Sequence, residues 1–184
     1  YLIEMNSYIM DSPNGFFFTA DDLERVVTIS SPELGSKEAV TYISEYFQEF
    51  SNAIYGREDD KPGWNPDTGL FYYDYCDLDS LVNSYLLQTI SSNGDGFWKS
   101  QFFYKDVGEI MYSGPIWDMD NSFGMLSDKQ ADPNEDVLRE KPISDGLINI
   151  PSFRYRLRER YFAHYHSIMA SLIGEDDKVM SFMD

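Results

Sequence analysis

Apolar residues recur at helical spacing in three stretches of the chain, and each stretch predicts a long helix. The first covers 36–56, where Ser36 can cap the amino end. The second covers 77–90, with Asp77 at the N-cap position, and the third runs from about 152 to 173. In the third helix, the residues expected to face inward are Phe153, Leu157, Tyr161, Tyr165, Ile168, Met169 and Leu172.

Short runs of aromatic and β-branched residues predict strands between these helices. Three runs lie near the start of the chain, at 1–5, 16–19 and 25–29, and two more form a β-hairpin over 101–112. Long helices combined with small antiparallel pieces predict the α+β class. A doubly wound sheet would need alternating strands and helices, and this alternation is missing from the pattern.

The remaining segments predict loops. Residues 57–69 hold two Pro and two Gly among charged residues, which is typical of a surface loop. Residues 113–150 read as irregular and acidic, with 132–136 as the most exposed part. A loop of that length is usually functional. A last short helix is expected after Gly174.

Composition narrows the classes of partner. The 184 residues carry 32 acidic and 14 basic side chains, for a formal charge of −18. This balance argues against nucleic acid as a partner, because proteins that bind it neutralise phosphates with clustered Lys and Arg. No apolar run approaches the roughly 18 residues of a membrane-spanning helix. The length predicts one domain or a piece of one.

Cysteine and histidine offer little chemistry. Cys76 is the single cysteine, which excludes an internal disulfide and a zinc site of several thiolates, and it is expected to be a small buried residue. His164 and His166 are two apart on a helix and therefore face different sides. A thiol-poor acidic surface suits a secreted bacterial protein, a spore surface or the cytosol of an anaerobe, so composition leaves the compartment open.

Residues 91–96 resemble the start of an EF-hand calcium loop. The twelfth position of such a loop needs a bidentate Glu, and here it is Phe102. We therefore reject an EF-hand.

Three aspartates around the hairpin are the main candidates for chemistry. Asp95 follows the end of the second helix, and Asp118 and Asp120 follow the hairpin. If the hairpin folds back, it brings these carboxylates together, and their repulsion is relieved by a hard divalent metal with oxygen ligands. Phosphoryl-transfer sites use this arrangement. The alternative is structural: Trp117 packs in a turn, the aspartates cap backbone amides, and Asp95 is a loop residue that tolerates positive φ.

The stretch 77–124 resembles the CotH family, the spore-coat-protein-H-like atypical protein kinases. It reads DLDSLVNSYLLQTISSNGDGFWKSQFFYKDVGEIMYSGPIWDMDNSFG. A helix ending in N-x-D, a K-S-x-F-x-Y-K-D strand and a G-P-x-W-D-x-D element followed by Phe-Gly carry the resemblance. The similarity extends over most of 1–170.

The resemblance implies a protein-kinase-like fold, with this chain as a mostly helical C-terminal lobe. It also implies transfer of the γ-phosphate of ATP to Ser or Thr of secreted or spore-coat proteins, with Mg²⁺ or Mn²⁺ as cofactor. ATP and a protein substrate are then the partners, and the location is extracellular or at a bacterial spore surface.

The resemblance also assigns roles to residues. Asp95 matches the catalytic aspartate that orients the substrate hydroxyl, and Asp118 and Asp120 match the metal-binding acidic motif. The residues expected to shape the site are Asn93, Trp117 and Asn121.

The chain departs from the kinase pattern in two ways. Ser100 lies five residues after Asp95, where a typical kinase has a metal-binding Asn, and this puts a second metal in doubt unless Asn121 or an aspartate substitutes. No Lys sits in a strand before residue 37 to contact phosphate. We therefore interpret 1–184 as one domain of hinge-side strands plus the C-terminal lobe, with the nucleotide lobe expected upstream and weak ATP binding expected of this segment alone.

Two further functions fit the same residues. One is a catalytically inactive kinase-like scaffold in spore-coat or cell-surface assembly, which the acidic segment 128–136 and the loss of Asn at 100 favour. The other is a calcium-stabilised surface module, which predicts stabilisation by Ca²⁺ without any effect of ATP.

Overall fold

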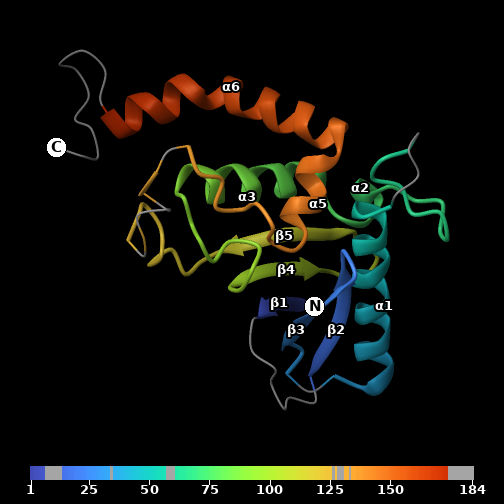
Figure 1. Cartoon of the computed structure of the whole chain (residues 1–184). Helices are drawn as coiled ribbons and strands as arrows, with labels where there is room; N and C mark the ends of the chain where they lie inside the picture. Colours follow the sequence, from blue (N-terminus) through green and yellow to red (C-terminus); the bar gives the residue numbers. More distant parts are fainter. Residues whose placement is uncertain are drawn as a thin grey trace.

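The structure is a computed structural model, and it shows an α+β protein built on a five-stranded antiparallel sheet (Figure 1). This confirms the predicted class. The residues that the structure describes are 1–6, 14–33, 35–56, 61–125, 127, 131–132 and 134–173.

The sheet joins the three opening strands of the chain to a hairpin from its middle. Its order is β2-β3-β1-β4-β5. The strands span Leu2–Asn6 (β1), Gly15–Ala20 (β2), Leu23–Ser31 (β3), Gln101–Lys105 (β4) and Met111–Ile116 (β5). Because β1 pairs with β3 on one side and with β4 on the other, the predicted hairpin is attached to the opening strands of the chain.

Helix α1, Lys37–Ile54, covers one face of the sheet (Figure 1). As predicted, Ser36 caps it, accepting a hydrogen bond from the backbone N–H of Ala39 at 3.2 Å. Phe47 is fully buried on this helix, and its ring lies 4.8 Å from that of Phe18 on β2 and 5.3 Å from that of Phe103 on β4. An aromatic core therefore lies between α1 and the sheet.

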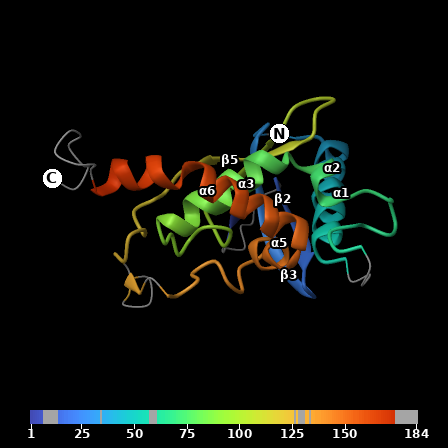
Figure 2. The same ribbon diagram turned by 90° about the horizontal axis from the view of Figure 1, so that it is seen from above.

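The other helices gather beyond the β4–β5 edge. They are α2 (Tyr72–Tyr75), α3 (Leu78–Ile90), α5 (Ser144–Asn149) and α6 (Pro151–Ile173). Seen from the front and from above, α6 runs along α3 (Figures 1 and 2). Phe153 of α6 packs on Tyr85 of α3, with ring centroids 5.5 Å apart, and Asp79 of α3 forms ion pairs with Arg156 and Arg160.

The two later long helices agree with the sequence prediction in extent. Asp77 is the N-cap of α3, and its carboxylate accepts a hydrogen bond from the backbone N–H of Ser80 at 2.8 Å. The expected inward stripe of α6 is confirmed only in part. Phe153 is fully buried, but Tyr161 and Tyr165 keep partial exposure because α6 extends past the end of α3 (Figure 2).

The prediction that 113–150 is irregular was wrong at two places. Strand β5 continues to Ile116, and α5 occupies Ser144–Asn149. The end of β5 was missed because it contains Gly114 and Pro115, and both residue types are rare in strands. Helix α5 has six residues, which is too short for helical periodicity to be recognised. The helix expected after Gly174 lies outside the described residues.

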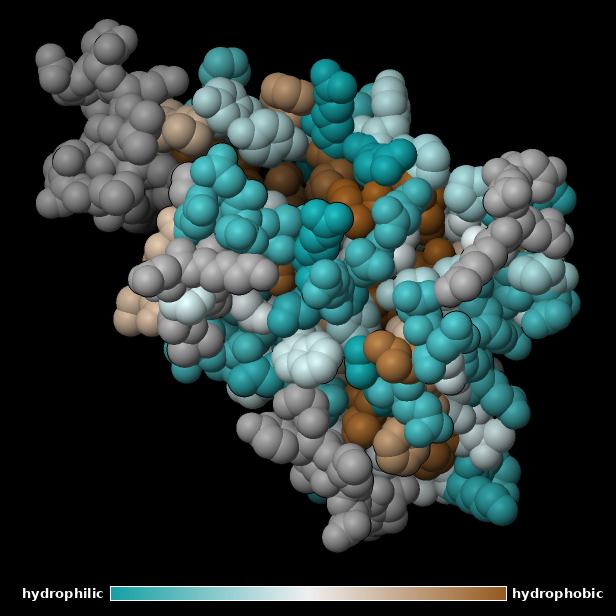
Figure 3. Space-filling model, in the orientation of Figure 1, coloured by the Kyte–Doolittle hydropathy of each residue, from teal (hydrophilic) through white to brown (hydrophobic). Residues whose placement is uncertain are grey.

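The surface is hydrophilic over most of the face seen in Figure 3, and hydrophobic residues show beneath α6. Cys76 is buried as expected, and burial raises the pKa of its thiol well above its ordinary value. His164 and His166 are both exposed. None of the helices in the described residues is long and apolar enough to cross a membrane.

Candidate functional site

The loop that follows α3 carries Asp95 and is anchored to a buried glutamine. Gln88, in the last turn of α3, is 1% exposed, and its Oε1 accepts a hydrogen bond from Nδ2 of Asn93 at 2.7 Å. Asn93 Oδ1 in turn accepts from the backbone N–H of Asp95 at 3.1 Å. Asp95 is therefore placed by a chain of polar contacts that begins inside the helix.

Gly96 allows this loop to approach α3 closely. A Cβ atom at Gly96 would lie 2.9 Å from Cδ and 3.0 Å from Oε1 of Gln88. Real side-chain carbons do not pack at such distances, so any larger residue here would force the buried Gln88 side chain to move. The next residue, Phe97, is buried against Tyr85, with ring centroids 6.0 Å apart.

The β4–β5 hairpin determines where the second acidic loop begins. Gln101, at the start of β4, is paired with Ile116, at the end of β5. Asp118 therefore emerges beside Ser100, whose hydroxyl donates a hydrogen bond to Oδ2 of Asp118 at 2.8 Å. Ser100 and Asp118 both have a φ of +58°, a backbone conformation that is rare for residues other than glycine.

The carboxylate of Asp95 has two side-chain partners, one from the second acidic loop and one from its own loop. Asn121 Nδ2 donates to Oδ2 of Asp95 at 2.6 Å. Lys99 Nζ forms an ion pair with the same oxygen at 3.2 Å. The Asp95 carboxylate is thus held at one oxygen by two donors, which fixes its orientation.

Two more contacts join the loops. The backbone N–H of Phe123 donates to the carbonyl of Ser91 at 2.6 Å. Asn93 Nδ2 also lies 3.4 Å from Sδ of Met119. The loop 91–100 and the loop 117–124 therefore form one unit.

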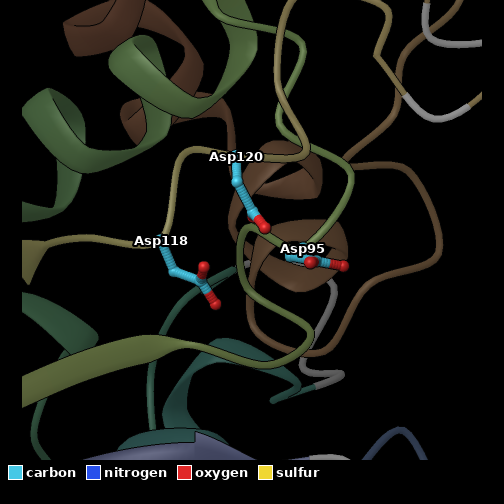
Figure 4. Close-up of side chains that lie close together, drawn as sticks. All are labelled: Asp95, Asp118 and Asp120. Atoms are coloured by element: carbon cyan, nitrogen blue, oxygen red, sulfur yellow. The ribbon is translucent and has the colours of Figure 1, made fainter.

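The three aspartates converge in this unit, as the hairpin predicts (Figure 4). One carboxylate oxygen from each of Asp95, Asp118 and Asp120 lies within 4.8 Å of the other two. Asp95 is only 6% exposed, whereas Asp120 is exposed. The donor set consists of carboxylate oxygens, which fits a hard divalent cation such as Mg²⁺, Mn²⁺ or Ca²⁺.

The residues predicted to shape the site lie near it in different ways. Asn93 and Asn121 both contact Asp95 directly. Trp117 is 46% exposed, and its ring packs against Phe102 on the sheet with centroids 5.4 Å apart. Asn93 and Asn121 therefore touch the carboxylate cluster, while Trp117 packs on the sheet next to Asp118.

Sequence reasoning missed three residues of the site. Lys99 could have been found, because it stands four residues after Asp95. Gln88 gave no signal, since it lies in a helix among apolar residues. Glu4 on β1 is a further acidic group nearby; partial burial and the negative charge of Asp118 raise the pKa of its carboxyl.

A cavity of about 670 Å³ opens beside Asp95 and Trp98. Its other wall comes from residues of both charges within 134–141. The Trp98 ring has the Arg25 guanidinium carbon at 5.1 Å and Lys141 Nζ at 5.2 Å from its centroid. Cationic groups therefore approach the indole from β3 and from the 134–141 segment. The cavity was not predicted from sequence, because it depends on how this long segment returns to the loop of Asp95.

Comparison with known proteins identifies the family. A family model described as CotH kinase protein matches residues 13–174, which is most of the chain. No curated protein and no solved structure was found to match. The chain belongs to the CotH kinase family.

Proposed function

We propose that this protein is a metal-dependent protein kinase of the CotH type, with a protein-kinase-like fold. It transfers the γ-phosphate of ATP to Ser or Thr of secreted or spore-coat proteins. The observation that carries the proposal is the convergence of three carboxylates from two loops within 4.8 Å of one another. Membership of the CotH kinase family supports the same reaction class.

Asp118 and Asp120 would hold Mg²⁺ or Mn²⁺. They belong to the same short loop, and their oxygens lie close enough to share one cation. A bound ion would supply positive charge to offset that of the phosphates.

Asp95 would orient the acceptor hydroxyl and take its proton. Asn121 and Lys99 both hold Oδ2, which leaves Oδ1 to accept from the substrate. As the hydroxyl oxygen bonds to the γ-phosphorus, the bond between that phosphorus and the oxygen bridging to ADP breaks, and the hydroxyl proton passes to Asp95. The positive charge of Lys99, which is paired with Asp95, would also attract the negatively charged phosphoryl group.

The cavity next to Asp95 supplies room for the acceptor. It is lined by Asp95 itself and is large enough to admit a side chain with part of its backbone. An extracellular or spore-surface location is part of the proposal and follows from the resemblance to the CotH family; the acidic composition and the single, buried cysteine are compatible with it.

The test measures the transfer of radiolabelled phosphate from ATP to protein, including the protein's own Ser and Thr residues. Asp95→Asn should lower the rate about 10²- to 10⁴-fold, because it removes the proton acceptor and preserves the shape of the side chain. Asp106→Asn, in the exposed β4–β5 turn, is the matched control and should leave the rate unchanged. Full activity in Asp95→Asn would refute the assignment.

A catalytically inactive scaffold is the second candidate, and Ser100 favours it. Its hydroxyl is bonded to Asp118 where a typical kinase has an Asn that binds metal. A scaffold would bind a divalent ion and show no phosphotransfer. A calcium-stabilised module would gain thermal stability from Ca²⁺ and none from ATP added with Mg²⁺.

A further inference from the structure

The position of Ser100 is fixed more firmly than a surface serine requires. It is the last residue before β4, and the strand pairing of Gln101 with Ile116 places it beside the loop that leaves β5. Its hydroxyl donates to Oδ2 of Asp118 at 2.8 Å. The contact therefore follows from the register of the hairpin.

This contact divides the two oxygens of Asp118 between two tasks. Oδ2 accepts from Ser100, and Oδ1 can then meet a cation without competing with this hydrogen bond. A carboxylate that is hydrogen-bonded at one oxygen presents the other in a fixed direction, and such supporting contacts govern metal affinity.

The spacing of the aspartates fits a single ion. Oxygens bound octahedrally at about 2.1 Å lie roughly 3.0 Å apart when adjacent and 4.2 Å apart when opposite. Asp118 and Asp120, whose oxygens lie within 4.8 Å of each other, can reach this geometry by moving closer around one ion, with Asp95 beside them. A second ion about 3.5–4 Å away would require further ligands, and Ser100 offers only a neutral hydroxyl oxygen, whose proton is donated to Asp118.

We infer that Ser100 is a positioning residue: its hydroxyl orients Asp118 toward a single divalent ion and does not itself bind that ion. The inference rests on the proposed metal site. It gives a function to a residue that otherwise counts only as a departure from the kinase pattern, and it makes the ion affinity depend on a side chain outside the carboxylate cluster.

The backbone of Ser100 allows a sharp test. With φ at +58°, replacement by glycine removes the hydroxyl and also relieves backbone strain. Ser100→Gly should therefore bind Mn²⁺ about tenfold more weakly, in calorimetry or by electron paramagnetic resonance, while the ion-free protein melts at the same temperature or higher. The wild-type protein should bind one Mn²⁺.

Two variants complete the test. Ser100→Asn keeps a donor and tolerates positive φ, so it should restore the affinity to within about threefold of wild type with one Mn²⁺ still bound; a second bound ion would show that the side chain at 100 acts as a ligand and would overturn the inference. Ser92→Gly is the matched control: Ser92 also has a positive φ, of +50°, and its replacement should leave the Mn²⁺ affinity unchanged.

The outcomes separate this inference from the proposed function. Unchanged affinity in Ser100→Gly overturns the role of Ser100 and leaves the metal site standing. Loss of melting temperature together with affinity indicates a structural role and also overturns it, as does binding of two ions by the wild type. Absence of Mn²⁺ binding by the wild type overturns the metal site and this inference together.

Discussion

The core between α1 and the sheet and the two loops that carry the aspartates are built in opposite ways. In the core, aromatic side chains such as Phe47 and Phe103 are fully buried and pack ring against ring. In the loops, position depends on hydrogen bonds between polar groups, as between Ser100 and Asp118 or Asn121 and Asp95. The stability of the fold therefore comes mainly from the aromatic core. The aspartate loops depend on that core to hold their ends in place.

The loops also contain non-glycine residues with positive φ, which helix α1 and the strands that it covers lack. Ser100, Asp118 and Phe123 all have positive φ, each costing on the order of 1–3 kcal/mol. Three carboxylates in close proximity add electrostatic repulsion. A strained, acidic site of this kind persists because the hairpin and α3 hold its ends, and a bound cation would relieve the repulsion.

The largest effect is expected from the core. Phe47→Ala should lower the free energy of unfolding by about 3–5 kcal/mol, because it leaves a cavity among aromatic rings. Urea denaturation measures this loss. Phe162→Ala, at a side chain that is 60% exposed, should cost about 0.5 kcal/mol or less. If Phe47→Ala lowered the free energy of unfolding by less than about 1 kcal/mol, the aromatic core would not be the main source of stability.

The next effect concerns the cation. Mn²⁺ at a hundred times its dissociation constant should stabilise the protein by about 2.7 kcal/mol, measured as a rise in melting temperature. Asp120→Asn should abolish that rise. In the absence of metal, the same variant should be slightly more stable than wild type, by about 1 kcal/mol or less, because one of three like charges is removed.

Glu135→Asn is the control for this experiment. Glu135 is an exposed acidic residue in the cavity wall, outside the carboxylate cluster, so its replacement should leave the Mn²⁺ effect intact. If Asp120→Asn were destabilising without metal, the description of the loops as a repulsive acidic site would be wrong.

The most local effect lies where the two regions meet. Gly96→Ala should cost about 1–3 kcal/mol, since its Cβ would lie 2.9 Å from Cδ of Gln88. It should also weaken Mn²⁺ binding, because Gln88 anchors Asn93 and through it Asp95. Urea denaturation and Mn²⁺ calorimetry report the two effects separately.

The control for Gly96→Ala is Gly35→Ala, where a Cβ would lie at an ordinary 3.6 Å from Val40 Cγ2. This variant should change neither quantity appreciably. Weakened ion binding in Gly35→Ala would mean that the loops respond to any change in the fold, so the specific link through Gln88 would fail.

Much of the fold could be predicted because long elements carry strong patterns. Ser36 and Asp77 cap the helices that they were expected to cap. The failures fall on short elements such as α2 and α5, and on the end of β5, where Gly114 and Pro115 hide the strand. In each case tertiary contacts decide the local structure, and a single sequence does not display them.

The site was predictable to the extent that it follows from the hairpin. The prediction that Asp118 and Asp120 return to Asp95 is confirmed as geometry, while their roles stay predictions. Two other residues of the site could not be found this way. Glu4 lies on β1, far along the sequence from the aspartate motif, and Gln88 lies among apolar residues of α3. Their contribution depends on the pairing of β1 with β4 and on the packing of the loop against α3, which no local pattern reveals.

The turn between β4 and β5 lies at the end of the hairpin away from the aspartates. Lys105 is paired with Met111 there, four residues along β4 from Gln101, or roughly 13 Å. Val107 in this turn is fully exposed. A fluorophore or affinity handle attached at Val107 should therefore report on the protein without disturbing ion binding, and insertions that lengthen this turn should be tolerated far better than a single residue added between Ile116 and Asp118.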